Sequence, residues 1–362
     1  MTESQQRWVA ILGRRDFPTD GVEDYCTFLG EALRRQGIEL QQMRVPWMEK
    51  GWIGALRQLS RDCEAWCGRW VLMQYTALAW SGRGFPLGAL AALAILRRRG
   101  ARVAVVFHES RRQDGSSQLQ GVRGACQDWV IQKLYQGATK SIFTAPVGTV
   151  VWLPKGEGKA AFIPIGANIP ERVARRTARI DRGKTVIVFG MTGAPKTERE
   201  VADIVGVMSE ASKKVEPLRL VVVGRGTMEV REQLAGALAS SNVEVIVRGV
   251  LPAEEIADEF ASADALLFAR GPVRYERGSA IAGIACGVPI IGYRDESTNG
   301  PLKDAGVEWS PSRDRDDLAR GLVRVLSDPS RWIELHERNI EAQKNWFSWD
   351  RIAEKYRAVL TE

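Results

Sequence analysis

The sequence predicts an α/β protein made of two doubly wound domains, each built on a parallel β-sheet. The chain has 362 residues, whereas a single hydrophobic core usually stops growing at roughly 250–300 residues. Short apolar runs rich in β-branched residues alternate with segments of helical spacing, which is typical of parallel sheets with crossover helices. The alternation stops once, near the middle of the chain, and then restarts. We therefore expect two domains of the same class.

The first domain is expected to span residues 1–168. Apolar runs predict strands at residues 8–12, 38–45, 70–75, 103–107, 140–143, 149–153 and 161–164. The intervening spacing predicts helices after the polar loop that contains Gly21, within residues 46–69, and over residues 88–98 and 121–135. This half is also rich in tryptophan, which predicts either a core or an apolar wall against which a ligand could stack. The tryptophans concerned are Trp47, Trp52, Trp66, Trp70 and Trp80.

Residues 169–184 carry charged clusters and a proline, and we interpret them as the interdomain linker. The second domain, residues 185–345, has the clearer pattern. Apolar runs predict strands at residues 185–189, 219–223, 243–247, 265–269 and 288–291. Residues 346–362 are aromatic and then amphipathic, so we expect a C-terminal helix that crosses back to the first domain.

Composition narrows the possible partners. The net charge of +7 favours an anionic partner, but no zinc-finger, helix-turn-helix or aromatic RNA-binding pattern indicates nucleic acid. Five cysteines without a CxxC pair and only two histidines argue against a structural metal site and for reduced thiols. The first residues lack an apolar signal core, and residues 85–96 are too short to cross a bilayer. We expect a cytoplasmic protein, with contact to the inner face of the membrane as a further possibility.

Residues 264–293 carry the strongest functional pattern. A buried strand is followed by a glycine-bearing loop, a helix that begins at Ser279, and another buried strand. A helix N-terminus presents unpaired N–H groups and partial positive charge, and glycine lets a phosphate approach the backbone. Arg274 and Arg277 add guanidinium groups beside it. Four of the five strands of this half end in glycine, and three of those loops contain Arg or Lys, so we expect a phosphate site.

Two other patterns have structural interpretations. The run 314–316, Asp-Arg-Asp, stands at the start of a predicted helix, where an aspartate caps N–H groups. Cys63 and Cys67 are spaced to lie on one face of a helix, and we expect packing rather than redox chemistry there.

Several segments, in this order, resemble retaining glycosyltransferases of the two-Rossmann-domain (GT-B) type, and most of all family 4 of the glycosyltransferases. They are DFPTDGVEDYCTFLGEALRRQG, FIPIGANIP, FGMTGAPKTERE, LRLVVVGRG, IACGVPIIG and FSWDRIAEKY. The resemblance covers nearly the whole chain and implies two Rossmann-like domains that face a central cleft. It also implies metal-independent transfer of a sugar from a nucleotide-diphosphate donor, UDP- or GDP-linked, to an acceptor hydroxyl with retention. The acceptor would be a sugar or a lipid-linked molecule on the first domain.

The same resemblance implies roles for particular residues. His108 would lie near the donor sugar, and Lys196 and Arg277 would act on the diphosphate, so these three are the expected catalytic residues. The residues expected to hold the donor nucleotide and its phosphates are Gly21, Gly190, Lys196, Arg225, Arg274, Arg277, Gly278 and Ser279. No metal ligand is expected.

The chain departs from the family at three positions. The family usually has two glutamates seven residues apart in the key loop and helix, and their places hold Arg274 and Ala282. The arginine that usually precedes the donor-domain lysine is Met191, for which Arg225, Arg270 or Arg277 could substitute. These departures leave open a non-catalytic sugar-nucleotide-binding or partner subunit with the same fold. A nucleotide-sugar epimerase is a third possibility, using carboxylates of the first domain for proton transfer. The carboxylates available are Asp16, Asp20, Glu23, Asp24 and Glu109.

Overall fold

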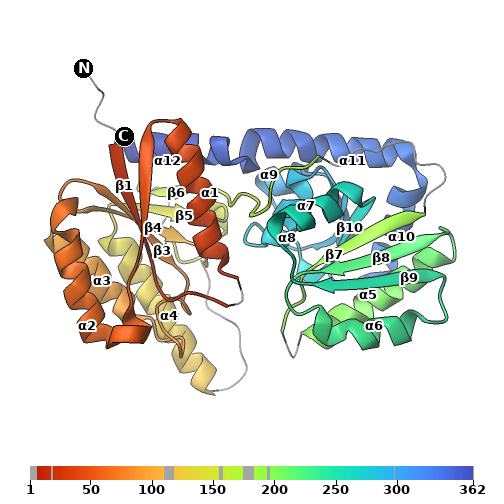
Figure 1. The fold of residues 1–362 in the computed structure, drawn as a ribbon, viewed down its shortest axis with the longest axis horizontal. Coiled ribbons are helices and arrows are strands. Elements are labelled where there is room, and N and C mark those ends of the chain that lie inside the picture. Colours follow the sequence, from red (N-terminus) through yellow and green to blue (C-terminus); the bar gives the residue numbers. More distant parts are fainter. Residues whose placement is uncertain are drawn as a thin grey trace. The chain divides into compact units, whose positions relative to one another are not determined.

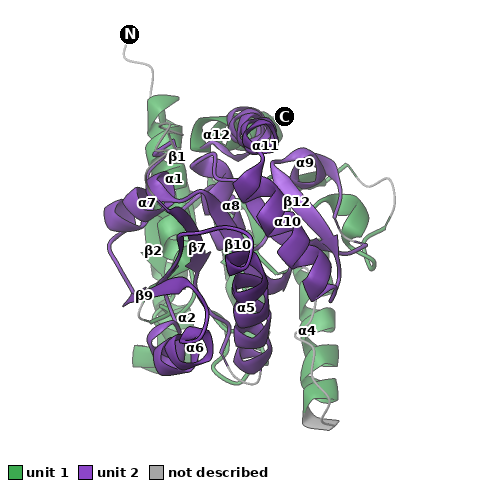
Figure 2. Cartoon of the chain, turned by 90° about the vertical axis from the view of Figure 1, so that its right-hand side faces the viewer, with its two compact units in different colours: residues 1–165, 349–362 green, residues 166–348 purple. Residues whose placement is uncertain are grey.

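The computed structural model describes residues 6–17, 19–109, 118–154, 158–173, 183–193, 196–296 and 298–361. The chain divides into two compact units, of which the first comprises Met1–Ile165 and Trp349–Glu362 and the second Gly166–Ser348 (Figure 2). Each unit has one six-stranded parallel sheet covered by helices on both faces (Figure 1). The predicted α/β class with two doubly wound domains is confirmed. None of the described helices combines the length and the apolar composition that a membrane crossing requires.

The sheet of the first unit has the strand order β2-β1-β3-β4-β5-β6. Its strands are β1 (Gln6–Leu12), β2 (Ile38–Arg44), β3 (Trp70–Tyr75), β4 (Arg102–Phe107), β5 (Lys140–Phe143) and β6 (Ala160–Phe162). Its helices are α1 (Gly21–Arg35), α2 (Trp47–Asp62), α3 (Leu87–Arg98), α4 (Gln118–Gly137) and α12 (Trp349–Thr361). One core joins α1 and α12 to one face of the sheet through residues such as Leu29 and Tyr356. A second core joins α2, α3 and α4 to the opposite face.

The sheet of the second unit has the order β12-β11-β10-β7-β8-β9. Its strands are β7 (Lys184–Phe189), β8 (Leu218–Val223), β9 (Val243–Gly249), β10 (Ala265–Pro272), β11 (Ile290–Arg294) and β12 (Val307–Pro311). Its helices are α5 (Thr197–Ser212), α6 (Arg231–Leu238), α7 (Ala253–Ser262), α8 (Gly278–Ala285), α9 (Gly300–Asp304), α10 (Arg315–Ser327) and α11 (Pro329–Ala342). The chain leaves β7 in one direction to form β8 and β9, and later returns to place β10 on the other side of β7. The carboxyl ends of β7 and β10 therefore flank the switch point at which such sheets bind ligands.

Two local predictions are wrong. Residues 149–153 do not form a strand, because Val147–Thr149 is a 3-10 turn and the side of β5 that β4 leaves free already pairs with β6. Cys63 and Cys67 do not share a helix face, since Cys63 is buried in a 3-10 turn and Cys67 is exposed after it. The predicted helix cap is confirmed, because the Asp314 side chain accepts a hydrogen bond from the Asp317 N–H.

The tryptophan cluster of the first unit serves mainly as core. Trp66, Trp70 and Trp80 are buried. Trp47 and Trp52 are half-buried, and their rings stack with centroids 5.1 Å apart. The interpretation of these residues as core is therefore correct for at least the three buried rings.

Candidate functional site

The loops after β7 and β8 are held tightly together at the carboxyl edge of the second sheet. The Gly190 N–H donates to the Val223 carbonyl at 2.7 Å, and the Met191 N–H donates to the Arg225 carbonyl at 2.9 Å. Gly190 has φ +75°, and a Cβ at this position would lie 3.2 Å from Nη1 of Arg270. The left-handed backbone and the close guanidinium both require glycine at residue 190.

The β7–α5 loop is shaped by a buried carboxylate. Glu200 is only 5% exposed, and its Oε2 accepts a hydrogen bond of 2.8 Å from the Thr192 N–H. The Thr192 carbonyl in turn accepts from the Thr197 hydroxyl, at the first residue of α5. The Thr192 hydroxyl accepts from Nε of Arg270 at 3.3 Å. The loop is thus folded around Thr192 and is tied to the end of β10.

Three arginines gather at this edge against one buried carboxylate. Burial lowers the pKa of the Arg270 guanidinium, and the nearby Arg277 and Arg225 lower it further, whereas Glu200 acts in the opposite direction. A guanidinium stays charged even when its pKa is lowered. Two further cations close to a partly buried cation are unfavourable in the free protein. The cluster of Arg225, Arg270 and Arg277, called here the arginine cluster, is therefore suited to an anion with more than one negative charge.

The N-terminus of α8 lies beside the arginine cluster and is not capped by any side chain of its own. Its N-cap residue is Arg277, and its first turn contains no acidic residue. Ser279 is 8% exposed, and its hydroxyl is buried with no hydrogen-bond partner among the described residues. The first N–H groups of a helix have no partner within the helix. The Ser279 hydroxyl and the first backbone N–H groups of α8 can therefore donate to an acceptor beside Arg277, which is the geometry of a phosphate site.

The remaining residues predicted for the second unit differ in their availability. Lys196 is exposed at the N-cap of α5 and has no capping hydrogen bond. Arg274 is engaged, because its Nε and Nη2 contact Oδ2 of Asp295 at 3.1 and 2.6 Å. Ala282 is 1% exposed inside α8, so its side chain points into the core rather than toward a ligand.

His108 and Gly21 belong to the first unit. His108 follows β4, and its Nε2 lies 2.8 Å from Oε1 of the buried Gln74. Burial lowers the pKa of His108 to about 4, against a smaller opposite effect of Asp20. The imidazole is therefore neutral near pH 7, with its proton on Nε2, and can accept or position but not neutralise a phosphate.

Gly21 is the first residue of α1. The N–H groups at the N-terminus of this helix already have an acceptor within the protein. The Asp20 carboxylate accepts from the N–H groups of Val22 and Glu23 at 3.1 and 3.2 Å. The same carboxylate forms an ion pair of 2.9 Å with Arg44. This helix end has no need of an external anion.

The carboxylates that an epimerase could use are mostly engaged in structure. Besides Asp20, Glu23 pairs with Arg44 at 3.0 Å, and Glu109 accepts from the Ala77 N–H at 3.1 Å. Asp24 differs, since burial raises the pKa of its carboxyl, helped by Asp20 and Glu23 and opposed by Arg15.

Sequence reasoning missed part of this arrangement. The role of Asp295 leaves no local signal, because it depends on a contact with a loop that follows another strand, whereas Glu200 contacts Thr192 in the loop directly before its own helix. Arg270 does leave a local signal in the sequence, because this charged residue ends the buried run ALLFAR just before a glycine.

Comparisons with known proteins agree with this fold. Residues 183–328 match the family model described as Glycosyl transferases group 1. No curated protein matches the chain at the level of sequence. Among solved structures, sucrose-phosphate synthase from Thermosynechococcus elongatus is 18% identical with a TM-score of 0.68, over 98% of this chain and 99% of that chain.

Two further solved structures are similar over almost their full length. HepE from Anabaena, in complex with UDP and glucose, is 11% identical with a TM-score of 0.67, over 98% of this chain and 99% of that chain. A putative UDP-N-acetylglucosamine 2-epimerase from Listeria monocytogenes is 10% identical with a TM-score of 0.65, over 99% and 96%. At these identities the matches show the fold, which is that of GT-B glycosyltransferases with two Rossmann-like domains. The second unit is in addition similar to group 1 glycosyl transferases in sequence.

Proposed function

We propose that this protein transfers a sugar from a nucleotide-diphosphate donor to an acceptor hydroxyl, with retention at the anomeric carbon. The observation that carries the proposal is the arginine cluster beside the uncapped N-terminus of α8, together with the Ser279 hydroxyl in the first turn of that helix, which has no hydrogen-bond partner among the described residues. A diphosphate would supply negative charge to the arginine cluster. It would also supply acceptor oxygens to the N–H groups at the helix N-terminus. The match of the second unit to group 1 glycosyl transferases supports the same assignment.

In the proposed reaction, the bond between the anomeric carbon and the diphosphate oxygen breaks, and a bond to the acceptor oxygen forms on the same face of the sugar. The hydroxyl proton is released, and the nucleoside diphosphate departs. Negative charge grows on the leaving diphosphate, so donors fixed in advance around it lower the barrier. We assign that role to Arg270, Arg277 and the first N–H groups of α8, with Lys196 as an additional cation from the N-cap of α5.

We further propose that no metal is needed, because three guanidinium groups supply positive charge where the diphosphate would sit. Activity in the presence of EDTA tests this point directly. Loss of activity that Mg²⁺ or Mn²⁺ restores would overturn it.

Recognition of the nucleoside must differ from that in glycosyltransferase family 4, which the chain resembles. Ala282 is buried and offers no carboxylate to a ribose, and Arg274 is held by Asp295. We propose a UDP- or GDP-sugar as donor, and the complex of the similar HepE with UDP supports the first.

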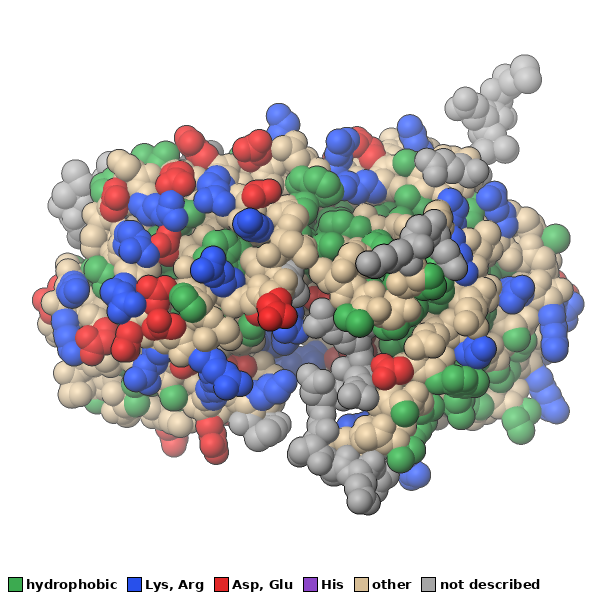
Figure 3. Space-filling model, turned by 180° about the vertical axis from the view of Figure 1, so that it is seen from behind, with side chains coloured by type: hydrophobic (Ala, Val, Ile, Leu, Met, Phe, Trp, Pro, Cys, Tyr) green, Lys and Arg blue, Asp and Glu red, His purple; other side chains and the backbone are tan. Residues whose placement is uncertain are grey.

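The first unit is proposed to bind the acceptor, and His108 is proposed as a neutral hydrogen-bonding group near the donor sugar. Its α2–α3 surface suits an acceptor carried on an anionic membrane at the cytoplasmic face. Ile53, Met48 and Leu87 are 71%, 57% and 52% exposed there. Exposed basic residues share the surface, namely Lys50, Arg57 and Arg61 of α2 and Arg97 and Arg98 of α3. Figure 3 views the chain from behind and shows basic and hydrophobic side chains on the first unit in its right half, without labels for the elements that carry them.

A further basic pair of the first unit, Arg111-Arg112, lies outside the described residues. Five free cysteines are compatible with the reducing cytoplasm proposed here. Sedimentation with anionic vesicles at low salt tests the membrane contact, and absence of binding would remove it.

Calorimetric titration with UDP, GDP, ADP and TDP tests the donor site. One preferred diphosphate with micromolar affinity is the expected result. Slow hydrolysis of the matching sugar nucleotide without acceptor would identify a transferase. Binding without hydrolysis or transfer would favour a non-catalytic partner subunit, and no binding in a folded sample would overturn the donor site.

An epimerase is the second candidate, because the fold is shared with a putative UDP-N-acetylglucosamine 2-epimerase and Asp24 has a raised pKa. Interconversion of the sugar with the nucleotide still attached, followed by NMR, would identify it.

A further inference from the structure

A glutamine stands inside a strand that is buried along its whole length and otherwise apolar. β3 reads WVLMQY, and Gln74 in it is 1% exposed. Its side chain points to the face of the sheet that α1 and α12 cover, because the alternate residues Trp70 and Leu72 belong to that core. A buried amide is unfavourable unless its polar atoms find partners. The partners of Gln74 therefore indicate why the strand contains it.

The two ends of the Gln74 amide have different partners. Its Oε1 lies 2.8 Å from Nε2 of His108, and its Nε2 donates to the Leu72 carbonyl at 3.5 Å. The reverse orientation of the amide would place Oε1 against the Leu72 carbonyl, and both of these oxygens only accept hydrogen bonds. Oε1 of Gln74 thus faces His108, and a hydrogen bond between them requires the proton on Nε2 of the imidazole.

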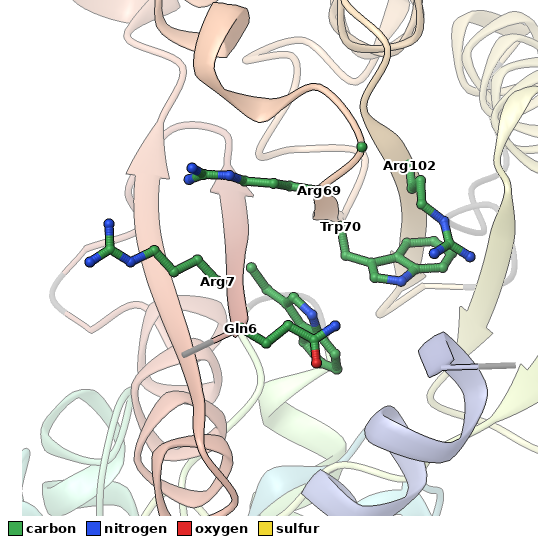
Figure 4. A pocket seen from close by; sticks show the side chains of 7 residues that line it. Gln6, Arg7, Arg69, Trp70 and Arg102 are labelled. Carbon is green, nitrogen blue, oxygen red and sulfur yellow. The ribbon is translucent and has the colours of Figure 1, made fainter. Parts of the chain in front are cut away.

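The strand that carries Gln74 is fixed at both ends. The Gln74 carbonyl accepts from the Trp80 indole at 2.8 Å, near the carboxyl end of β3. At the amino end, the Trp70 indole donates to the Leu360 carbonyl of α12 at 2.6 Å. The Arg102 guanidinium lies 4.2 Å from the centroid of the Trp70 ring, and Figure 4 shows it lying along that ring. These side-chain contacts add to the sheet hydrogen bonds, so the Gln74 amide has a rigid support.

The imidazole of His108 is held from two further directions. The His108 N–H donates to the Tyr75 carbonyl at 3.1 Å, which ties the residue after β4 to the end of β3. The Tyr25 ring of α1 lies at 86° to the imidazole, with centroids 4.9 Å apart. The Tyr25 hydroxyl is engaged elsewhere, 2.7 Å from the Tyr356 hydroxyl of α12. Neither contact is a hydrogen bond to Nδ1 of His108, and the described residues supply none.

From this geometry we infer that Gln74 is a positioning residue, which fixes His108 as the tautomer with a protonated Nε2 and an acceptor at Nδ1. This assignment rests on the proposed function, in which His108 meets the donor sugar. An acceptor nitrogen cannot bind an ionised phosphate oxygen, which also only accepts, so its partner must be a hydroxyl that donates. The other groups that face the imidazole are the neutral Tyr25 and the Asp20 carboxylate, whose effect on the pKa of His108 is smaller than that of burial. A neutral amide at residue 74 therefore leaves the ring uncharged and able to accept.

The test follows the ring nitrogens of His108 by NMR, using the full chain labelled with ¹⁵N on histidine. The chain has only two histidines, and the His108 signals are assigned by their loss in His108→Gln. At pH 7 the wild type should show a protonated Nε2 and an unprotonated Nδ1. Gln74→Met has a similar length but no acceptor, and Gln74→Asn is too short to reach, so each should give the averaged signals of both tautomers. Gln127→Met, the matched control, removes another buried amide of the first unit, which donates to the Gly84 carbonyl, and should leave the His108 signals unchanged.

Kinetics connect the tautomer with sugar transfer. Gln74→Met should lower kcat about tenfold, the equivalent of one lost hydrogen bond. The KM for the sugar nucleotide should hold, since the diphosphate is proposed to bind to the second unit. Gln74→Glu keeps an acceptor for the Nε2 proton but adds a negative charge, so the pKa of His108 should rise from about 4. As the pH is lowered, this variant should lose activity at a higher pH than the wild type, because a protonated Nδ1 cannot accept.

The NMR measurement needs no substrate, so it decides the role of Gln74 even if the chain transfers no sugar, whereas the diphosphate titration decides the donor site. A wild-type imidazole with its proton on Nδ1 would overturn the inference. So would a single Nε2-protonated tautomer retained in both Gln74→Met and Gln74→Asn. An unchanged kcat in a folded variant with mixed tautomers would likewise show that the fixed tautomer does not serve the reaction.

Discussion

Replacing Arg270 with glutamine tests whether the arginine cluster exists for a ligand or for the fold. Arg270 is partly buried near two other arginines and makes one long hydrogen bond, from Nε to the Thr192 hydroxyl at 3.3 Å. The loop keeps its main support in the variant, because Glu200 still accepts from the Thr192 N–H. Removing the charge also relieves repulsion from Arg225 and Arg277. We expect the free energy of unfolding to change by less than about 1 kcal/mol, the usual worth of a neutral hydrogen bond.

The effect on ligand binding should be much larger than the effect on stability. A hydrogen bond to a charged group contributes about 1.5–3 kcal/mol, so the Kd for the preferred nucleoside diphosphate should rise roughly 10- to 150-fold. Turnover should fall further than binding, since charge on the diphosphate grows in the transition state. Calorimetric titration gives the Kd, and denaturant unfolding gives the stability.

Arg219→Gln provides a matched control. Arg219 lies near the amino end of β8, which β7 separates from β10, and it pairs with Glu244 at 2.7 Å on the surface. Its loss should leave nucleotide binding unchanged. The reasoning is refuted if Arg270→Gln binds the diphosphate as the wild type does, or if it unfolds several kcal/mol more easily while a folded fraction binds normally.

Three further outcomes follow from the same geometry. Lys196→Ala should weaken diphosphate binding by about 1–3 kcal/mol, measured by calorimetry, and unchanged affinity would remove this exposed lysine from the site. Ser279→Pro removes a backbone donor at the start of α8, so it should abolish diphosphate binding; normal binding by a folded variant would show that the anion lies elsewhere. Because the pKa of His108 is lowered from 6.5 to about 4, the folded state disfavours the imidazolium, and stability should be full above pH 6.5 and fall as the pH drops toward 4. Unfolding measured against pH should show a shallower fall in His108→Gln, and an identical pH dependence would contradict the lowered pKa.

Most strands and their order along the chain could be predicted from the sequence, because buried parallel strands leave continuous apolar runs. The glycine-ended strands of the second unit likewise indicate the carboxyl edge of its sheet, where the proposed site lies. The failure at residues 149–153 has a physical cause, since their β-branched residues satisfy local propensity but β6 already occupies the free edge of β5. Strand propensity is a property of a single residue, whereas a strand also needs a neighbouring strand whose edge is still unpaired.

Pairings between loops were not readable from the sequence. Arg274 was expected to meet a phosphate, and no pattern announces that Asp295, twenty-one positions later, lies 2.6 Å from it. Asp20 is different, because an aspartate directly before a helix is an ordinary cap signal. Asp20 directly precedes Gly21, and the prediction gave a functional role to the glycine rather than to the aspartate.

The N-termini of α1 in the first unit and of α8 in the second differ in a way that supports the proposal that the second unit binds the donor. In both, a helix begins after a parallel strand, and its first N–H groups carry partial positive charge. At α1 the chain supplies its own anion, the Asp20 carboxylate, and fixes that carboxylate with Arg44. At α8 it supplies an arginine, no acid in the first turn and a buried hydroxyl without a partner. A missing cap costs about 1 kcal/mol of stability, and the crowding of Arg225, Arg270 and Arg277 adds to it. A bound diphosphate would offset both costs; among the described residues, Glu200 counteracts part of the crowding at Arg270.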